Sequence, residues 1–520
     1  MPTSYEIYQT YLRGPAAVIR LFEQALGTQA IYGPPHPDMQ QRTIESLSEE
    51  IGRLKSQVAR LKEELSETRG DNHRLRRRNA ELEALVTKDS HNSSRPPSTD
   101  PPWGKRTKSL RQPSGKRPGG QPGHSGHTLR LTRKPTRVVT HRPPECRHCQ
   151  TPLREGQVIG SERRQVVELV PVRRRIIEHR AEVVCCPACG RRTKAEFPEG
   201  VRATMQYGPS VLARALYLHD YQFLPYARTA EAMRELFGCA MSAGTVSTAV
   251  RQCASGLVAT ELQIKRSLRR SSVIHADETG LRINGRLGYA HVASTPGLTH
   301  YASDARRGKA AMDEIGVLPQ YRGTCVHDGW LSYTFYPKCR HALCGAHLLR
   351  ELVYFEELGE ETKAWAAPLK ELLLDMKAEV ERVSAEGGKR LPAQRVEELT
   401  ARYDQLVVEG LQAQPPPGVP EQVWKQARNL LLRLERRKEE VLRYVTDFSV
   451  PFDNNQAERD LRMVKLQQKT SGCFRTEEGA RRFCRIRSYV STMRKQGKGV
   501  LRALAGACRG APLRVSKRAG

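Results

Sequence analysis

Residues 272–280 read Ser-Val-Ile-His-Ala-Asp-Glu-Thr-Gly, an apolar run that leads into Asp277. This pattern predicts a buried strand that ends at the acid, and the alternating residues 282–294 predict the next strands of a meander. Residues 323–330, Gly-Thr-Cys-Val-His-Asp-Gly-Trp, repeat the arrangement and deliver Asp328. Glu458 follows far downstream, at the start of a predicted helix. The sequence therefore predicts an α/β domain in which two strands and one helix each supply a carboxylate.

The chain as a whole is strongly basic. Its 520 residues contain 86 Lys and Arg against 56 Asp and Glu, a formal net charge of +30. This balance favours a polyanionic partner and argues against an enzyme of small metabolites. With 38% hydrophobic residues, no apolar run of membrane-spanning length and no signal pattern at the N-terminus, we expect a folded cytoplasmic protein with no membrane partner.

Carboxylates gathered in a basic chain indicate phosphodiester chemistry. Cleavage or transfer needs an activated oxygen nucleophile and a neutralised leaving oxygen, which two Mg²⁺ ions about 3.5–4 Å apart supply. Mg²⁺ prefers carboxylate oxygens. For a single Asp beside a Gly, a turn or helix cap is the simpler interpretation. The joint pattern instead favours Asp277, Asp328 and Glu458 as metal ligands.

Thirteen cysteines include two Cys-x-x-Cys pairs. A reducing compartment favours metal thiolates over disulfides. Two such pairs, brought together by a small sheet from the alternating residues 164–184, would form a closed, structural Zn²⁺ site. The alternative is four unrelated buried cysteines, and Cys185 and His148 are the neighbours that would replace a misassigned ligand. The predicted zinc ligands are Cys146, Cys149, Cys186 and Cys189.

Residues 44–86 carry a heptad pattern. The a positions are Ile44, Ile51, Val58, Leu65, Asn72, Asn79 and Val86, and the d positions are Leu47, Leu54, Leu61, Leu75 and Leu82, with Thr68 interrupting the seam. β-Branched residues at a with Leu at d favour two parallel strands. We expect a homodimer or higher oligomer; the alternative is an amphipathic helix packed on its own domain.

Three further segments are candidates for DNA contact. Residues 90–130 form a linker rich in Pro, Gly and basic residues, including Lys116 and Arg117, which either contacts nucleic acid or is only solvated. Residues 207–256 predict helix, turn at Gly238 and helix from the Ser242 cap, a helix-turn-helix layout that a packing domain would also show. The basic C-terminal region begins on the Glu458 helix and binds phosphates or pairs with the Glu-rich residues upstream; its first members are Arg459, Arg462, Lys465 and Lys469.

Several motifs together resemble the large transposase of the insertion sequence 66 family. They are residues 92–100, 119–124, 275–280, 327–330 and 453–459 with the two cysteine pairs, in the family's order and spread over residues 44–500. The resemblance implies a DDE transposase with a ribonuclease H-like core, in which Asp277, Asp328 and Glu458 bind Mg²⁺ or Mn²⁺. Cys344-Gly-Ala-His347 resembles the Cys-x-x-His element that follows the second Asp in several DDE families. The family typically comes with accessory proteins.

The expected organisation is therefore multidomain. Helical periodicity in residues 361–383, 393–412 and 421–444 predicts a helical insertion, with Pro368 kinking or splitting its first helix; periodicity alone would also allow a separate domain. The expected segments are residues 1–40 of unknown role, a coiled coil (41–89), a linker (90–130), a zinc-binding module (131–200), a helical module (203–260), a catalytic domain (268–500) with an insertion at about 348–447, and a basic tail (501–520).

The function expected from these features is transposition. The chain would bind double-stranded DNA at the ends of its own element and catalyse strand cleavage and transfer into a target. One rival is a ribonuclease H-like nuclease that cuts without joining. The other is a non-catalytic, dimeric DNA-binding regulator, which leaves the three acids unexplained.

Overall fold

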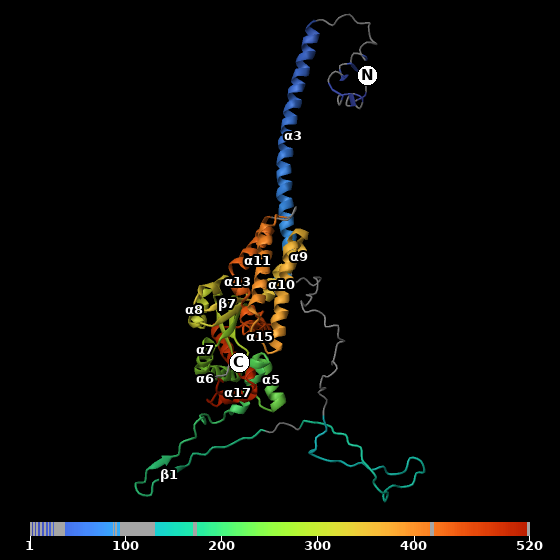
Figure 1. Cartoon of the computed structure of the whole chain (residues 1–520). Helices are drawn as coiled ribbons and strands as arrows, with labels where there is room; N and C mark the ends of the chain where they lie inside the picture. Colours follow the sequence, from blue (N-terminus) through green and yellow to red (C-terminus); the bar gives the residue numbers. More distant parts are fainter. Residues whose placement is uncertain are drawn as a thin grey trace. The chain divides into compact units, whose positions relative to one another are not determined.

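The computed structural model describes residues 37–86, 88, 91–93, 130–169, 174–415 and 421–516, with scattered positions among the first 24 residues. It divides into two compact units, residues 1–87 with 418–423 and residues 88–417 with 424–520 (Figure 1). Lys116 and Arg117 lie outside the described residues, as does most of the predicted linker. Every helix in the described part of the chain is too short or too polar to span a lipid bilayer.

In the first unit, one long helix runs through the predicted heptads. This helix, α3, spans Pro37–Val86. The seam side chains Ile51, Leu54, Val58, Leu61 and Leu65 are each about half exposed in the single chain. The apolar stripe of α3 is therefore uncovered.

The second unit is built on a five-stranded mixed sheet with the order β5-β4-β3-β6-β7. Strands β3 (Val273–Ile283), β4 (Arg286–Ser294) and β5 (Thr299–Asp304) form an antiparallel meander. Strands β6 (Thr324–His327) and β7 (Arg340–Leu343) continue the sheet in parallel with β3. The chain is thus a mixed α/β protein, as the sequence predicts.

Strand β3 is longer than the sequence pattern predicts. The prediction that it ends at Asp277 is wrong, because residues 278–283 continue the antiparallel pairing with β4 and Asp277 lies opposite Val292. The chain reverses instead at Asn284 and Gly285, whose φ angles are 50° and 75°. An Asn-Gly pair between two strands is the preferred sequence of a two-residue hairpin turn. This pair, and not the Gly280 region, is the turn signal.

Helices cover the sheet and share one core with it. Helix α15 (Asn455–Ser471) packs on β3 and β4, and α16 (Glu477–Lys495) packs on β5. The core also takes Leu216, Val250 and Leu268 from helices α4, α6 and α7. These span Pro209–Leu216, Ala243–Gly256 and Val258–Arg269. A short π-helix at Tyr217–Tyr221 and helix α5 at Tyr226–Phe237 lie between α4 and α6 in the chain. The helix-turn-helix-like region therefore packs on neighbouring helices: α6 packs on α16, and α7 contacts β5.

The predicted basic tail is in part a buried helix. Helix α17 (Val500–Cys508) places Ala503 and Leu504 in the same core as the sheet. The apolar residues of its inner face outweigh the flanking basic residues, so the expectation of a tail from residue 501 is wrong for this stretch.

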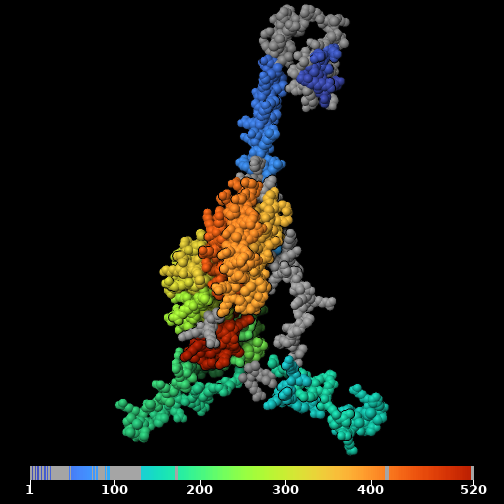
Figure 2. All heavy atoms as spheres, in the orientation of Figure 1, coloured from blue at the N-terminus to red at the C-terminus, as the bar shows by residue number. Residues whose placement is uncertain are grey.

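The predicted helical insertion lies between β7 and α15. It consists of α9 (Gly345–Leu358), α10 (Glu360–Ala385), α11 (Ala393–Gln412), α12 (Glu421–Arg436) and the short helices α13 (Lys438–Val441) and α14 (Arg443–Thr446). Its longest helices form an elongated lobe, orange in Figure 2. Helix α10 is not split at Pro368, because buried Trp365, Leu369 and Leu373 hold both sides of the proline in the packed layer.

Candidate active site

The parallel pairing of β3 and β6 brings two of the predicted acids near each other. The parallel pairing ends at His275 and Val326, and Asp277 and Asp328 each follow two residues later. The charge of Asp328 contributes to the raised pKa of the Asp277 carboxyl, so the two acids lie near each other. Strand β6 ends at His327, and Gly329 follows Asp328 with a φ of 92°. That turn lets the Asp328 carboxylate accept a hydrogen bond from the Trp330 amide at 2.9 Å. Asp328 is therefore fixed at the end of its strand, whereas Asp277 lies in mid-strand.

Glu458 reaches the same region from the first turns of α15. Asn454, the residue just before α15 begins, is fully buried and holds the start of this helix against the sheet. Its Nδ2 donates to the Ala276 carbonyl at 2.9 Å, and its Oδ1 lies 3.0 Å from His275 Nδ1. Its backbone amide donates to Cys344 Sγ at 3.2 Å. Asn454 thus holds α15, and with it Glu458, against the strand that contains Asp277.

A close backbone approach fixes the other side of this junction. The Gly345 amide donates to the Phe452 carbonyl at 2.8 Å. A Cβ atom on Gly345 would lie 2.3 Å from the Phe452 ring, so only glycine fits at this position. The start of α9 is therefore locked to the segment that precedes Glu458.

Helix α9 presents a second group to Glu458. Ligand atoms of Cys344, His347 and Glu458 all lie within 4.8 Å of one another. His347 Nδ1 is 4.0 Å from Glu458 Oε1, and neither buried atom has a hydrogen-bond partner among the described residues. Buried polar atoms without partners are costly, and a cation between them would satisfy both. The donor set therefore fits a divalent metal ion.

The electrostatics of Asp277 lead to the same conclusion. Burial raises the pKa of the Asp277 carboxyl well above its usual value, and the nearby charges of Glu278 and Asp328 add to the rise. Glu458 contributes in the same direction. Like charges this close repel one another unless a cation or a proton intervenes. The negative charge of these carboxylates thus favours the binding of cations.

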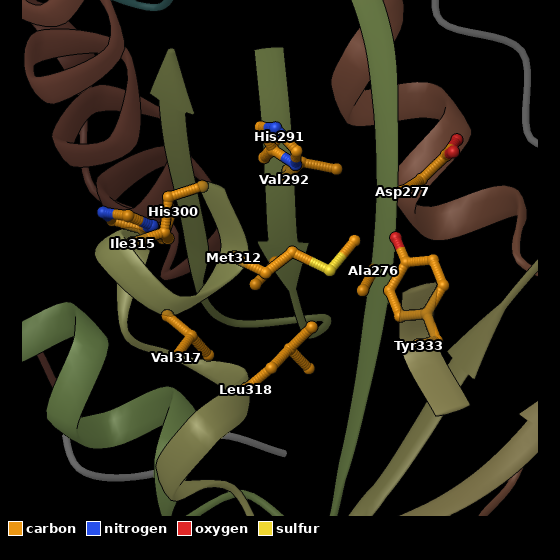
Figure 3. A pocket seen from close by; sticks show the side chains of 11 residues that line it. Ala276, Asp277, His291, Val292, His300, Met312, Ile315, Val317, Leu318 and Tyr333 are labelled. Carbon is orange, nitrogen blue, oxygen red and sulfur yellow. The ribbon is translucent and has the colours of Figure 1, made fainter. Parts of the chain in front are cut away.

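A small cavity behind Asp277 is too small to hold the substrate. It is lined mostly by apolar side chains from β3, β4 and the segment around Met312, with a volume of about 30 Å³. Figure 3 shows Asp277 and Tyr333 at one side of it and the Met312 side chain reaching across it. This space admits about one water molecule and excludes a nucleotide. Any nucleic acid would therefore meet the acids from outside.

The outer face of α15 is basic. Arg459, Arg462, Lys465 and Lys469 are all exposed, and Lys465 Nζ donates to the Gly280 carbonyl at 2.8 Å. Their spacing keeps them near one face of the helix that bears Glu458. This face offers positive charge beside the acids.

The two Cys-x-x-Cys pairs adopt the same turn. In each, the amide of the first cysteine donates to the carbonyl five residues later, at 2.9 Å for Cys146 and 2.8 Å for Cys186. The amide four residues later donates back to the first cysteine at 2.9 Å in both turns. The residue after the second cysteine, Gln150 or Gly190, has a φ of 58° or 69°. The second turn closes the hairpin of β1 (Val183–Cys185) and β2 (Arg192–Lys194).

The structure does not gather the four cysteines into one cluster. Within the described ranges, the group of at least three His, Cys, Asp or Glu ligand atoms found close together is the one at Cys344, His347 and Glu458. The predicted small sheet between the pairs is limited to β1 and β2, because residues 164–169 and 174–182 form no strand. Apolar side chains there, such as Val166 and Leu169, remain exposed.

Comparison with known families agrees with the resemblance in the motifs. The model described as "Transposase IS66 family" matches residues 204–482, more than half of the chain. The chain belongs to the IS66 transposase family. A second model, a family of unknown function (DUF6444), matches residues 34–130. No curated protein matches the chain.

Membership of the IS66 family makes the chain a transposase in its coarse function, a DNA-processing enzyme. The matched range includes all three candidate acids and the Cys344 to His347 element. The sequence interpretation did not include two features near the acids. One is the set of Asn454 contacts, and the other is the pairing of Glu278 with Arg307 and Tyr333. Asn454 stands in the quoted motif at residues 453–459, so its position was available, whereas the partners of Glu278 come from distant segments and leave no pattern in the sequence.

Proposed function

We propose that this IS66 family transposase is a DDE enzyme with a ribonuclease H-like core. Asp277, Asp328 and Glu458 hold divalent ions, Mg²⁺ or Mn²⁺, at the edge of the sheet. The observation that carries the proposal is the parallel β3–β6 pairing, which ends at His275 and Val326, two residues before Asp277 and Asp328. The strand order, three antiparallel strands followed by two parallel ones, is also the order expected of a ribonuclease H-like core.

Each of these residues has a separate role at the proposed site. Two ions would supply an activated oxygen nucleophile, first a water and then a freed 3′-hydroxyl, and a neutralised leaving oxygen. Asp277 and Asp328 hold the ions from the rigid sheet. Glu458, positioned by Asn454, closes the site from α15. His347 lies beside Glu458, with its Nδ1 atom 4.0 Å from Glu458 Oε1, and would supply a nitrogen ligand on that side of the site.

The partner is double-stranded DNA, both the element ends and the target. The exposed basic face of α15 would bind backbone phosphates beside the acids, because such contacts position DNA irrespective of sequence. We further propose that the segment at 131–200 and the linker, with Lys116 and Arg117, recognise the ends. The protein would act in the cytoplasm at the nucleoid, with accessory proteins of the same element.

An assay with labelled element ends and a plasmid target tests this function. Incubated with Mg²⁺, the full chain is expected to release cut ends and to join them to the plasmid. Cut ends without joined product would assign a nuclease, and binding without any product would assign a regulator. Either outcome contradicts the proposal.

The cysteine turns are proposed to bind one structural Zn²⁺ through Cys146, Cys149, Cys186 and Cys189. Two turns of matching hydrogen-bond pattern support this, since two such thiolate pairs supply the four ligands of a tetrahedral Zn²⁺ site. Metal analysis of the purified chain is expected to find about one zinc, and the Cys146→Ser, Cys186→Ser variant is expected to lose it. Cys185→Ser, next to the second pair, is the control and should retain the metal. An unchanged zinc content in the double variant would refute this ligand set.

Helix α3 is proposed to form a parallel coiled coil with a second copy. Its uncovered apolar stripe supports this, because pairing would bury the a and d side chains. Replacing Leu54 and Leu61 by Glu is expected to convert a dimer, or a larger assembly built on it, to monomers in analytical ultracentrifugation. The control exchanges Ser56 and Ala59, at the outer f and b positions, for Glu. Unchanged mass in the seam variant would rule out α3 as the dimer contact.

A further inference from the structure

Glu278 is a buried acid beside the proposed triad that already has partners for both of its oxygens. Its Oε1 accepts hydrogen bonds from Arg307 Nε at 3.0 Å and Nη2 at 2.8 Å. Its Oε2 accepts one from the Tyr333 hydroxyl at 2.8 Å. The Glu278 side chain is 1% exposed. Since successive strand residues face opposite sides, Glu278 also points away from the face that Asp277 occupies. Glu278 is therefore engaged in holding Arg307.

Arg307 is fixed from a second direction. Its guanidinium lies over the Trp330 ring, 4.2 Å from the centroid, an arrangement in which the cation is attracted to the ring face. Trp330 is itself tied to the site, because its amide donates to Asp328. Arg307 is thus held at its Nε edge by one acid and on one face by the residue that follows the Asp328 turn.

The rest of this guanidinium is open. The Arg307 side chain is 43% exposed, and none of the described residues is hydrogen-bonded to its Nη1. The adjacent Arg306 differs, because it is bonded to both Asp304 and Glu314. An arginine whose orientation is fixed in advance loses less conformational freedom when it binds, and its planar donors match a phosphate.

We propose that Arg307 binds a backbone phosphate of the DNA strand that lies at the candidate active site. Glu278 and Trp330 are positioning residues for this contact. The inference rests on the proposed function and deepens it, because it names a DNA contact of the same site. It also explains why Glu278, although next to Asp277 in the chain, is bonded to an arginine and is not a metal ligand.

The test compares Arg307→Gln with the matched control Arg306→Gln in the full chain. Binding of a labelled duplex that carries the element's terminal sequence, and of an unrelated duplex, is measured in Mg²⁺ buffer at several KCl concentrations. Arg307→Gln is expected to weaken binding of both duplexes about tenfold and to reduce the slope of log K against log salt by about 0.9, the loss of one phosphate contact. Arg306→Gln is expected to leave affinity and slope unchanged. An Arg307→Gln slope equal to that of the parent overturns the proposal.

Two further variants separate a DNA contact from a purely structural role. Arg307→Lys keeps the charge and is expected to preserve most of the slope. Glu278→Gln combined with Arg307→Gln removes the buried acid together with its partner, and the slope is expected to stay reduced. If this double variant regains the parent slope, Arg307 only neutralises Glu278 and the inference is wrong.

The results also separate this inference from the proposed function. If the parent chain joins ends but the salt slope of Arg307→Gln equals that of the parent, this inference alone is wrong. A parent that binds with the predicted slopes but forms no product would sink the proposed function alone.

Discussion

Replacing Asp277 by Asn is expected to reduce strand cleavage and joining by about a thousandfold or more, while binding of the element ends is retained. The amide keeps the size of the side chain but removes the charge that would hold a divalent ion, and such ions contribute several kcal/mol to the transition state. Asp328→Asn is expected to behave in the same way, because Asp328 follows the strand parallel to β3 and lies close enough to Asp277 to raise its pKa. Product formation from labelled ends measures the effect.

Asp277→Asn, which is expected to reduce activity, is expected to increase the stability of the metal-free protein. Asp277 is buried among other carboxylates, so Asp277→Asn is expected to raise the melting temperature in metal-free buffer. Added Mn²⁺ should then stabilise the parent more than the variant. Asp404→Asn is the control, since Asp404 lies in the helical insertion and pairs with Lys438. Full joining by Asp277→Asn would contradict the assignment of this residue.

Replacing Asn454 by Ala is expected to lower the free energy of unfolding by about 2–4 kcal/mol, because the buried Ala276 carbonyl and the His275 ring would lose their partner. Strand transfer is expected to fall about 10- to 100-fold, as for other residues that orient a metal ligand. Urea unfolding and the joining rate measure the two effects.

Asn455→Ala is the matched control for this substitution. Asn455 is exposed, and within the described ranges its side chain donates only to Asp453, two residues before it. Its replacement is expected to change stability by less than about 1 kcal/mol. If Asn454→Ala retained the joining rate of the parent, the placement of Glu458 would not depend on this junction.

The sequence predicted those parts of the site that depend on local pattern. Apolar runs ending near Asp277 and Asp328 identified the two central strands, and the periodicity of residues 393–412 matches α11 in both bounds. The error at the end of β3 came from ending the strand at Asp277 when the Asn284-Gly285 pair was the turn signal. Local signals of this kind can be read from the chain alone.

Other features depend on contacts between distant segments. Arg307 meets Glu278 across 29 residues, and Asn454 meets His275 across 179. The sequence around Arg307 or Asn454 has no spacing pattern or composition that predicts these contacts. Helix α17 was missed for a related reason, because its basic surroundings concealed an apolar face that only the packed core makes evident. The predicted acids needed strand order and register before their proximity could be seen.

The most direct test of the account is a crystal structure of the full chain grown with Mn²⁺, with the ions located by their anomalous scattering. The account predicts manganese ligated by Asp277 and Asp328, with Glu458 completing the site from α15. Manganese sites elsewhere, or these three carboxylates turned away from any shared ion, would contradict it.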